Sequence, residues 1–203
     1  MDSRVRMIAA VAAVGAVLLA SGSVAASAGV AAASGSNGWG TAWEVPGTAA
    51  LNQGGVAEVV SVSCAAAGNC GAGGSYRDSS GNFQAFVVNQ VNGTWHTAIE
   101  VPGTAALNQG GDAGIRSVSC AAAGNCSAGG SYTDSSGNVQ LFVVNQVNGT
   151  WHKAIEVPGI AALNQGGEAE ITAVSCAAAG SCSAVGDYLD SSLGQQAFVV
   201  SKT

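Results

Sequence analysis

Charged residues are scarce in this chain of 203 amino acids, and basic residues are the scarcest. Only 9% of the residues are charged, with 6 Lys and Arg against 12 Asp and Glu, which gives a formal charge of −6. From Gly29 onward, four basic side chains stand against eleven acidic ones. Nucleic acids and anionic membranes both require clustered Lys and Arg. The composition therefore argues against either as a partner.

Motifs of common enzymes are also missing. There is no G-x-S-x-G nucleophile motif and no arginine cluster of the kind that a sialidase needs for a carboxylate. Neither His96 nor His152 stands in a zinc-type pattern with cysteine. Recurrent carboxylates occur at Glu44, Glu100 and Glu156 and at Asp78, Asp134 and Asp190. Tripled carboxylates are more typical of solvated or turn-capping groups than of a glycosidase pair. We therefore expect no enzymatic activity, cofactor or metal ion, with a glycosidase-like or sialidase-like hydrolase as the alternative.

Long apolar runs are limited to the first residues. Arg4 and Arg6 precede the apolar run from Ile8 to Ala20, which is followed by Ala26-Ser27-Ala28. This order predicts a cleaved signal peptide over residues 1–28, because the run is shorter than the roughly 20 residues of a membrane span. The Ala/Gly/Ser-rich residues 29–38 predict a flexible linker. We expect a secreted protein, extracellular or associated with the cell wall, with no membrane span after signal removal.

The rest of the chain is a unit of 56 residues that repeats over residues 39–94, 95–150 and 151–203. The first two copies differ at ten of 56 positions. Each copy begins with a tryptophan, at Trp39, Trp95 and Trp151. Repetition at such a period indicates an architecture assembled from equivalent supersecondary units. The sequence therefore predicts a single repeat domain over residues 39–203.

Each copy carries two cysteines separated by five residues. The pairs are Cys64 and Cys70, Cys120 and Cys126, and Cys176 and Cys182. A hairpin turn of this length can place the flanking residues opposite each other, near disulfide distance. Such pairs are oxidised in secreted proteins, and C-x5-C is not a zinc spacing. We predict three disulfides, each within one repeat.

The second copy shows the expected local structure. Its patterns predict four antiparallel strands over residues 113–120, 126–132, 139–147 and 151–157, with a five-residue turn at 121–125. The continuously apolar residues 141–144 are typical of a strand buried on both faces. Asn148-Gly149 is a hairpin signal, and the alternation over 151–157 indicates one wet face. The connection 158–167 fits either one helical turn or a plain loop.

The strand order is shifted by one strand at the ends of the chain. It opens with a strand of the fourth kind, 39–45, and closes with one of the third kind, 196–200. Pairing of these ends would give three four-stranded sheets, the closure device of β-propellers. The predicted fold is all-β, with three four-stranded antiparallel blade-like sheets. Propellers have four to eight blades, so completion by a homodimer, a β-trefoil or β-prism, and a truncated member of a longer repeat family stay open.

The repeat resembles a known type of secreted protein. Ser117-Val118-Ser119-Cys120, Cys126-Ser127-Ala128-Gly129 and Asn148-Gly149-Thr150-Trp151 resemble the S-V-S-C-x5-C-x-A-V-G … N-G-T-x-W units of secreted tandem-repeat proteins from high-GC Gram-positive bacteria. Those proteins look like β-propellers of the sialidase/Asp-box kind. The resemblance covers residues 39–203, although residues 91–95 lack the aspartate of the Asp-box. It implies a propeller-like fold and no particular activity.

We expect a secreted, non-enzymatic repeat domain that binds or acts as a scaffold at the cell surface or outside the cell. The polar pairs that connect the repeats are candidate ligand loops: Asn52 and Gln53, Asn108 and Gln109, and Asn164 and Gln165. Carbohydrate is the expected ligand class, because weak identical sites gain from multivalency. A purely structural domain is the alternative. We further expect Trp95 and Trp151 to be buried between sheets.

Overall fold

The structure, a computed structural model, describes residues 38–202. The chain divides into two compact units, residues 1–42 and 43–203. The predicted signal peptide and all but the last residue of the predicted linker lie outside the described residues.

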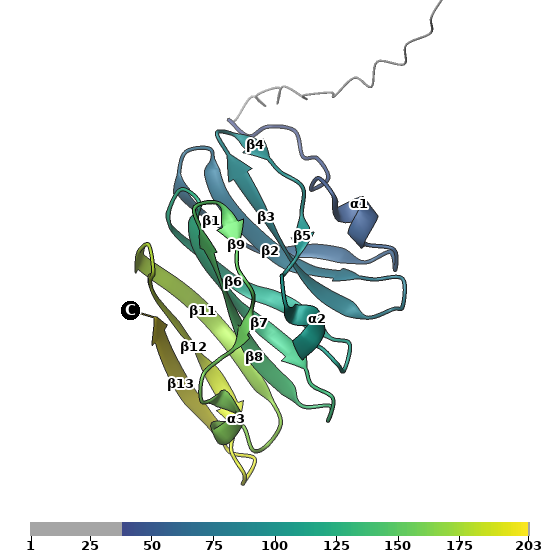
Figure 1. The fold of residues 1–203 in the computed structure, drawn as a ribbon, viewed down its shortest axis with the longest axis vertical. Helices are drawn as coiled ribbons and strands as arrows, with labels where there is room; N and C mark the ends of the chain where they lie inside the picture. Colours follow the sequence, from purple (N-terminus) through teal and green to yellow (C-terminus); the bar gives the residue numbers. More distant parts are fainter. Residues whose placement is uncertain (1–37, 203) are drawn as a thin grey trace, which may run out of the picture. The chain divides into compact units, whose positions relative to one another are not determined.

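Each repeat forms three long antiparallel strands joined by short hairpins (Figure 1). In the first repeat these are β1 (Ala57–Ala66), β2 (Asn69–Arg77) and β3 (Phe83–Val91). In the second they are β6 (Ala113–Ala122), β7 (Asn125–Thr133) and β8 (Val139–Val147). In the third they are β11 (Ala169–Ala178), β12 (Ser181–Leu189) and β13 (Gln195–Lys202). The all-β prediction is confirmed: three antiparallel sheets of five, five and three strands are present, and none of them is closed.

The third strand of the repeat matches its prediction best. β8 has the predicted bounds, and Leu141, Phe142 and Val144 on it are fully buried. Side chains on both faces are therefore covered, as a continuous apolar run requires. At the following hairpin Asn148 has φ 49° and Gly149 has φ 84°, which is the left-handed backbone that an Asn-Gly hairpin turn needs.

The turn between the first two strands is shorter than predicted. β6 continues past the first cysteine to Ala122, and β7 resumes at Asn125, which leaves two residues in the turn. Gly124 adopts φ 72°, and the small alanines before it allow this tight reversal. Cys120 still lies directly opposite Cys126 in the register of the two strands. The longer strands therefore leave the predicted cysteine pairing intact.

The predicted fourth strand, residues 151–157, is wrong as a continuous element. It consists of β9 (Thr150–Trp151) and β10 (Ile155–Glu156), and the first repeat likewise has β4 (Thr94–Trp95) and β5 (Ile99–Glu100). Between the two pieces, the amide of Ala154 donates to the carbonyl of Pro102 at 2.7 Å and leaves the sheet. Burial consequently departs from simple alternation, because Ala154 is buried and Ile155 is 51% exposed.

The predicted opening strand, residues 39–45, is also wrong. None of its residues lies in a strand, and among the described residues β13 has no partner other than β12. Val45 packs on the core of the first sheet, and the carbonyl of Pro46 accepts a hydrogen bond from Ala98 at 2.7 Å. The end of this segment is therefore held by the first sheet, and among the described residues no strand is added to the third sheet.

The connections between repeats are helical, one of the two predicted alternatives. They contain α1 (Thr48–Leu51), α2 (Thr104–Leu107) and α3 (Ile160–Leu163). Each helix follows a glycine in the left-handed region, such as Gly103 with φ 87°, and ends at an asparagine. The first residue of each helix is buried, so each connection is anchored on a sheet.

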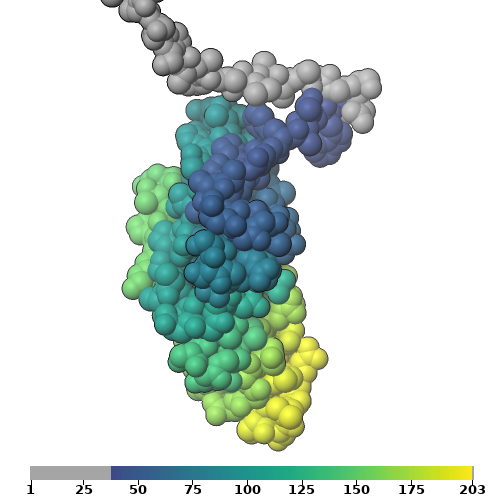
Figure 2. Space-filling view, turned by 90° about the vertical axis from the view of Figure 1, so that its right-hand side faces the viewer, coloured from purple at the N-terminus to yellow at the C-terminus, as the bar shows by residue number. Residues whose placement is uncertain are grey.

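The second sheet lies between the other two (Figures 1 and 2). One core joins Ala85 and Val87 of β3 to Ile115 and Val118 of β6. Another joins the second sheet to the third and includes Ile171 of β11. Burial between consecutive sheets, in addition to burial within each, therefore holds the repeats together.

Candidate functional site

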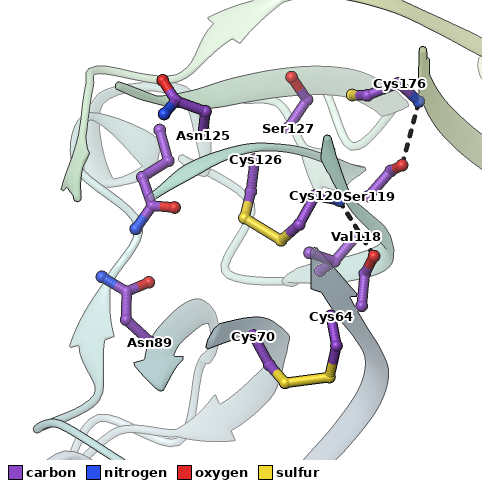
Figure 3. Close-up of a disulfide and its surroundings, with 12 residues drawn as sticks. Cys64, Cys70, Asn89, Val118, Ser119, Cys120, Asn125, Cys126, Ser127 and Cys176 are labelled. Carbon is purple, nitrogen blue, oxygen red and sulfur yellow. Dashed lines mark hydrogen bonds between the residues drawn. A yellow bond between two sulfur atoms is a disulfide. The ribbon is translucent and has the colours of Figure 1, made fainter. Parts of the chain in front are cut away.

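The three predicted disulfides are present, and each joins the first two strands of one sheet. They are Cys64–Cys70, Cys120–Cys126 and Cys176–Cys182. The second disulfide also faces the first sheet, because a Cβ added to Gly71 would lie 3.0 Å from Cys120 Sγ. The third lies against Ser127, whose Oγ is 3.1 Å from Cys182 Sγ. The second and third disulfides therefore belong to the contacts between sheets, and Figure 3 shows the second one.

The serines of the S-V-S motif join consecutive sheets. Ser61 Oγ accepts the amide of Val118, and Ser63 Oγ accepts the amide of Cys120, each at 3.0 Å. The same two bonds recur between the second and third sheets, from Val174 to Ser117 at 2.9 Å and from Cys176 to Ser119 at 3.0 Å. Figure 3 shows the second of them. These amides lie on the first strand of each sheet, which is an edge strand. A serine hydroxyl of the preceding repeat accepts the hydrogen bond that the carbonyl of a neighbouring strand would otherwise accept.

The third tryptophan of the repeat series, Trp151, joins two sheets, as predicted, whereas Trp95, for which the same burial was predicted, contacts the core of the first sheet only. Trp151 is 6% exposed, and its Nε1 donates to Asn89 Oδ1 at 2.8 Å. Asn89 in turn donates to the carbonyl of Gly149 at 3.2 Å. The sequence analysis missed Asn89, although the same residue recurs as Asn145. Trp95 is half-buried on the core of the first sheet, whereas Trp39 is 80% exposed.

The asparagines of the predicted ligand loops lie at the same boundaries between sheets. Asn108 Nδ2 donates to the carbonyl of Phe83 at 2.9 Å and to Gln84 Oε1 at 3.1 Å. Asn164 makes the equivalent bonds to the third strand of the second sheet. Both asparagines are buried, and in all three loops the Asn Oδ1 is buried without a hydrogen-bond partner. Asn52 is half-buried, and its Nδ2 makes no hydrogen bond in the described part of the chain.

The glutamines of these loops close the short helices. Gln109 Nε2 donates to the carbonyls of Ala105 and Ala106, at 2.9 Å and 3.4 Å. Gln53 and Gln165 do the same in their own loops. All three glutamines are exposed. The ligand-loop hypothesis stays a prediction, and only the glutamines present their side chains to solvent in all three copies.

The recurrent glutamates accept hydrogen bonds from tyrosines. Tyr76 donates to Glu100 at 2.9 Å, and Tyr132 donates to Glu156 at 2.8 Å, in each case across one sheet. Burial, with the adjacent carboxylate, raises the pKa of both phenols well above the ordinary tyrosine value. Glu44 has no tyrosine partner among the described residues and accepts only from Thr48, at 3.3 Å.

The recurrent aspartates cap turns, as predicted. Asp134 Oδ1 accepts the amides of Ser136 at 2.8 Å and Asn138 at 3.0 Å. Slight desolvation opposes ionisation of Asp134, but these hydrogen bonds hold its pKa below the usual value. The amide of Gly194 has the same effect on the pKa of Asp190. His96 and His152 are exposed, as expected for the wet face of the outer segment.

A groove of about 280 Å³ lies between the second and third sheets. Five of its lining residues are the counterparts, 56 positions on, of residues at the boundary between the first and second sheets. They are Val143, Asn145, Pro158, Cys182 and Val200, equivalent to Val87, Asn89, Pro102, Cys126 and Val144. At that earlier boundary, the segment from Trp151 to Ala154 occupies this place. Among the described residues, no such segment fills the groove.

Comparison with protein-family models and with characterised protein sequences gave no match. Within residues 38–202, no three His, Cys, Asp or Glu side chains come together in a group that could hold a metal ion. The helices of the same described region are all too short to cross a membrane.

Proposed function

We propose that this protein is a secreted, non-enzymatic repeat module that binds or acts as a scaffold at the cell surface or outside the cell. The observation that carries this proposal is the use of the recurrent polar side chains. Ser, Asn, Asp and Glu at equivalent positions hold sheets or turns together within the described residues. A catalytic site needs reactive groups that converge in one pocket and are free to act, so these contacts favour a structural module.

The finer architecture that we propose is a propeller-like stack of blades, as the resemblance to secreted actinobacterial-type repeat units implies. Each sheet contacts the preceding one through its first strand: β6 packs on β1, β2 and β3, and β11 packs on β6, β7 and β8. The serine–amide bonds repeat between the same strands. The same contacts recur from one pair of neighbouring sheets to the next, as is typical of consecutive blades. For this reason we rank a β-trefoil or β-prism second.

Secretion is supported by the predicted signal peptide and by the three intrachain disulfides. Disulfides persist in oxidising compartments and are rare in reducing ones. Mass spectrometry of the culture medium of the native host tests this part, since a chain that begins near Gly29 and carries no free thiol is expected. Recovery of reduced, full-length chain from the cytoplasm would contradict it.

The proposed ligand is a carbohydrate bound at the exposed glutamines of the three loops, Gln53, Gln109 and Gln165. Identical weak sites on one rigid domain act together, so replacing all three is expected to lower retention about tenfold or more. The measurement is a glycan array and a cell-wall pulldown with the protein from a secreting host, against the triple variant Gln53→Ala, Gln109→Ala and Gln165→Ala.

A matched control replaces two exposed hairpin residues at the other end of the strands, Thr94→Ala and Thr150→Ala. Retention of this control together with loss of the triple variant would place the ligand on the loops. Equal retention of both variants would move the ligand elsewhere on the module. No retention of the unmodified protein on any glycan or cell-wall fraction would favour the purely structural role.

A further inference from the structure

We propose that a second copy of this chain donates its residues 39–45 to the open edge of β13 and to the groove beside it. The inference rests on the blade-like stacking proposed above, and it names a partner for the ends of the stack. Contacts inside the chain predict the contacts of the donated segment, because equivalent positions are 56 residues apart.

The backbone register follows from the second sheet. There Glu156 of β10 lies opposite Phe142 of β8, and the first sheet pairs Glu100 with Phe86 in the same way. Moved on by one repeat, this register places Glu44 of the donor opposite Phe198 of β13. The amide of Gly40 would then donate to the carbonyl of Ser201, and the amide of Val45 to the carbonyl of Ala197. The equivalent amides of the second sheet donate to carbonyls of β8 in the same way. The edge of β13 that has no partner among the described residues therefore presents the carbonyls with which an added strand can pair.

The groove accepts the tryptophan of the donor. Asn145 on its wall is the counterpart of Asn89, which binds Nε1 of the buried Trp151 at 2.8 Å. Trp39 is the counterpart of Trp151, but it is 80% exposed. Asn145 Oδ1 accepts a hydrogen bond from Ser127 Oγ at 2.7 Å, and with Trp39 seated in the groove of a second copy it would accept one from the indole Nε1 as well. The transfer removes a large aromatic surface from water, as anchor residues of interfaces do.

The tyrosine–glutamate pair of the repeat is incomplete at Tyr188 and at Glu44 in the described part of the chain. Tyr76 and Tyr132 each donate to a glutamate of the fourth segment of their own sheet. The hydroxyl of Tyr188, their counterpart on β12, makes no hydrogen bond among the described residues. Glu44 occupies the position of the missing acceptor in the donor segment. The same register therefore satisfies Tyr188 with Glu44 of the second copy.

The faces behind the donated segment also match. On the first sheet Val59 and Val62 are 45% and 59% exposed, although their counterparts Ile115 and Val118 are buried. On the third sheet Val199 is 70% exposed, although its counterpart Val87 is buried. Contact between these faces would bury apolar side chains that are now exposed to water.

Polar groups continue the match on the same two faces. Ser175 is the counterpart of Ser119 and could accept the amide of Cys64, as Ser119 accepts that of Cys176. Asn52 Nδ2 would reach the carbonyl of Gln195, as Asn108 Nδ2 reaches that of Phe83. The exception is Ala173, which replaces the other serine of the motif.

Side-chain size is compensated at this boundary. Gly129 faces Ile171, with 2.7 Å between an added Cβ and Ile171 Cδ1. In the proposed contact Val185 takes the place of the glycine and Val59 takes the place of the isoleucine. Val185 is larger than the glycine and Val59 lacks the Cδ1 methyl of the isoleucine, so the smaller side chain offsets part of the added volume. The described residues of each chain include one donor segment and one acceptor edge, and two copies that use both would bring six sheets together, within the range of closed propellers.

The test is the mass of the native particle, measured by light scattering over a range of concentrations on the protein from a secreting host. A mass of two chains is expected. Trp39→Ala should weaken the pair by about thirtyfold or more, the effect of losing an interface anchor. Thr41→Ala is the matched control, because its counterparts Thr97 and Lys153 are exposed, and it should leave the mass unchanged.

Two asparagine variants, one in the groove and one inside the chain, separate the effect on assembly from the effect on folding. Asn145→Ala should weaken the pair as Trp39→Ala does. Asn89→Ala removes the equivalent bond inside one chain and should lower stability without changing the mass. A single-chain mass at all concentrations would overturn the proposal, including the case in which a chain closes on its own segment. A two-chain mass that neither Trp39→Ala nor Asn145→Ala changes would overturn it as well. The glycan-binding result is independent of these masses.

Discussion

At the scale of single residues, small neutral side chains make the hydrogen bonds between repeats. Ser61, Ser63 and Asn108 bond the backbone of a neighbouring sheet, and Asn89 binds the indole of Trp151. Neutral hydroxyls and amides can be buried at lower cost than ions, provided that they are hydrogen-bonded. A chain with only 9% charged residues is therefore well suited to join its sheets in this way.

Removing one of these hydroxyls tests its contribution. Ser119→Ala leaves the amide of Cys176 without its acceptor, at a boundary where the bond is 3.0 Å long. We expect the free energy of unfolding to fall by about 1 kcal/mol, the net contribution of a hydrogen bond, because the bond is only partly buried. Urea denaturation measures the change, with Ser135→Ala in an exposed turn as the control. Equal stability of the two variants would show that the serine bond is not needed.

The turn aspartates should make stability depend on pH. The pKa values of Asp78, Asp134 and Asp190 are below their ordinary value in the folded chain. Their stabilisation is therefore complete above the unfolded pKa of about 3.9 and is lost as the pH falls through the folded pKa. The triple Asp→Asn variant should have a lower urea midpoint than the unmodified protein at about pH 6, and the difference should shrink at about pH 2.5. A constant difference would contradict a role for the ionised form.

At the scale of elements, the second strand of the first sheet and of the second sheet has a glycine where the next sheet packs, Gly73 and Gly129. A Cβ on Gly129 would lie 2.7 Å from Ile171 Cδ1 and 3.1 Å from Val174 Cγ2. The equivalent residue of the third repeat is Val185, which is 40% exposed. The position is therefore a glycine where the next sheet of the same chain packs on it, and a valine on the face that a second copy is proposed to cover.

A substitution in each strand tests this relation. Gly129→Val should lower the free energy of unfolding by about 1–3 kcal/mol, because the added atoms overlap β11. Val185→Ile is the control, because it enlarges the equivalent exposed position and should stay within about 0.5 kcal/mol. Both substitutions are made in the Trp39→Ala background, which weakens the proposed pair. Denaturation then compares the free energy of unfolding of single chains. Tolerance of valine at position 129 would mean that the sheets are less closely packed than the structure shows.

Prediction from the sequence succeeded where the pattern of an element is local. β8 and its Asn-Gly hairpin follow from an apolar run and a turn signal within one repeat. The fourth strand could not be predicted as it is, because Ala154 leaves the sheet for the carbonyl of Pro102 in the preceding connection. For the same reason the candidate ligand loops were only partly understood, since the acceptors of Asn108 lie 24 and 25 residues away in another sheet.

At the scale of the whole molecule, burial is greatest in the middle repeat. Val118 is 6% exposed, whereas Val62 at the equivalent place of the first repeat is 59% exposed. In repeat proteins each unit is stabilised by its neighbours, so units at the ends have fewer stabilising contacts. The middle disulfide, Cys120–Cys126, is accordingly covered by the first sheet, and Cys64 is exposed.

Removal of single disulfides should follow this order. Closing a loop of this length contributes roughly 2–2.5 kcal/mol in the chain-entropy model, so replacing Cys64 and Cys70 together by Ala should cost about that much. Replacing Cys120 and Cys126 should cost about 1 kcal/mol more, because a cavity opens against Gly71. Thermal unfolding in the Trp39→Ala background provides the measurement. A larger loss at Cys64–Cys70 would contradict the central position of the middle repeat.

The sequence by itself determined the repeat, the all-β class and the pairing of the cysteines. These depend on residues close together in the chain, where spacing and turn chemistry act directly. Only the tertiary structure decided which copy of each residue is buried, and which serines and asparagines join the sheets. Those bonds span 57 residues in the case of the serines, from one repeat to the next. Nearly identical copies have the same local pattern, so their different environments arise from the position of each repeat in the stack.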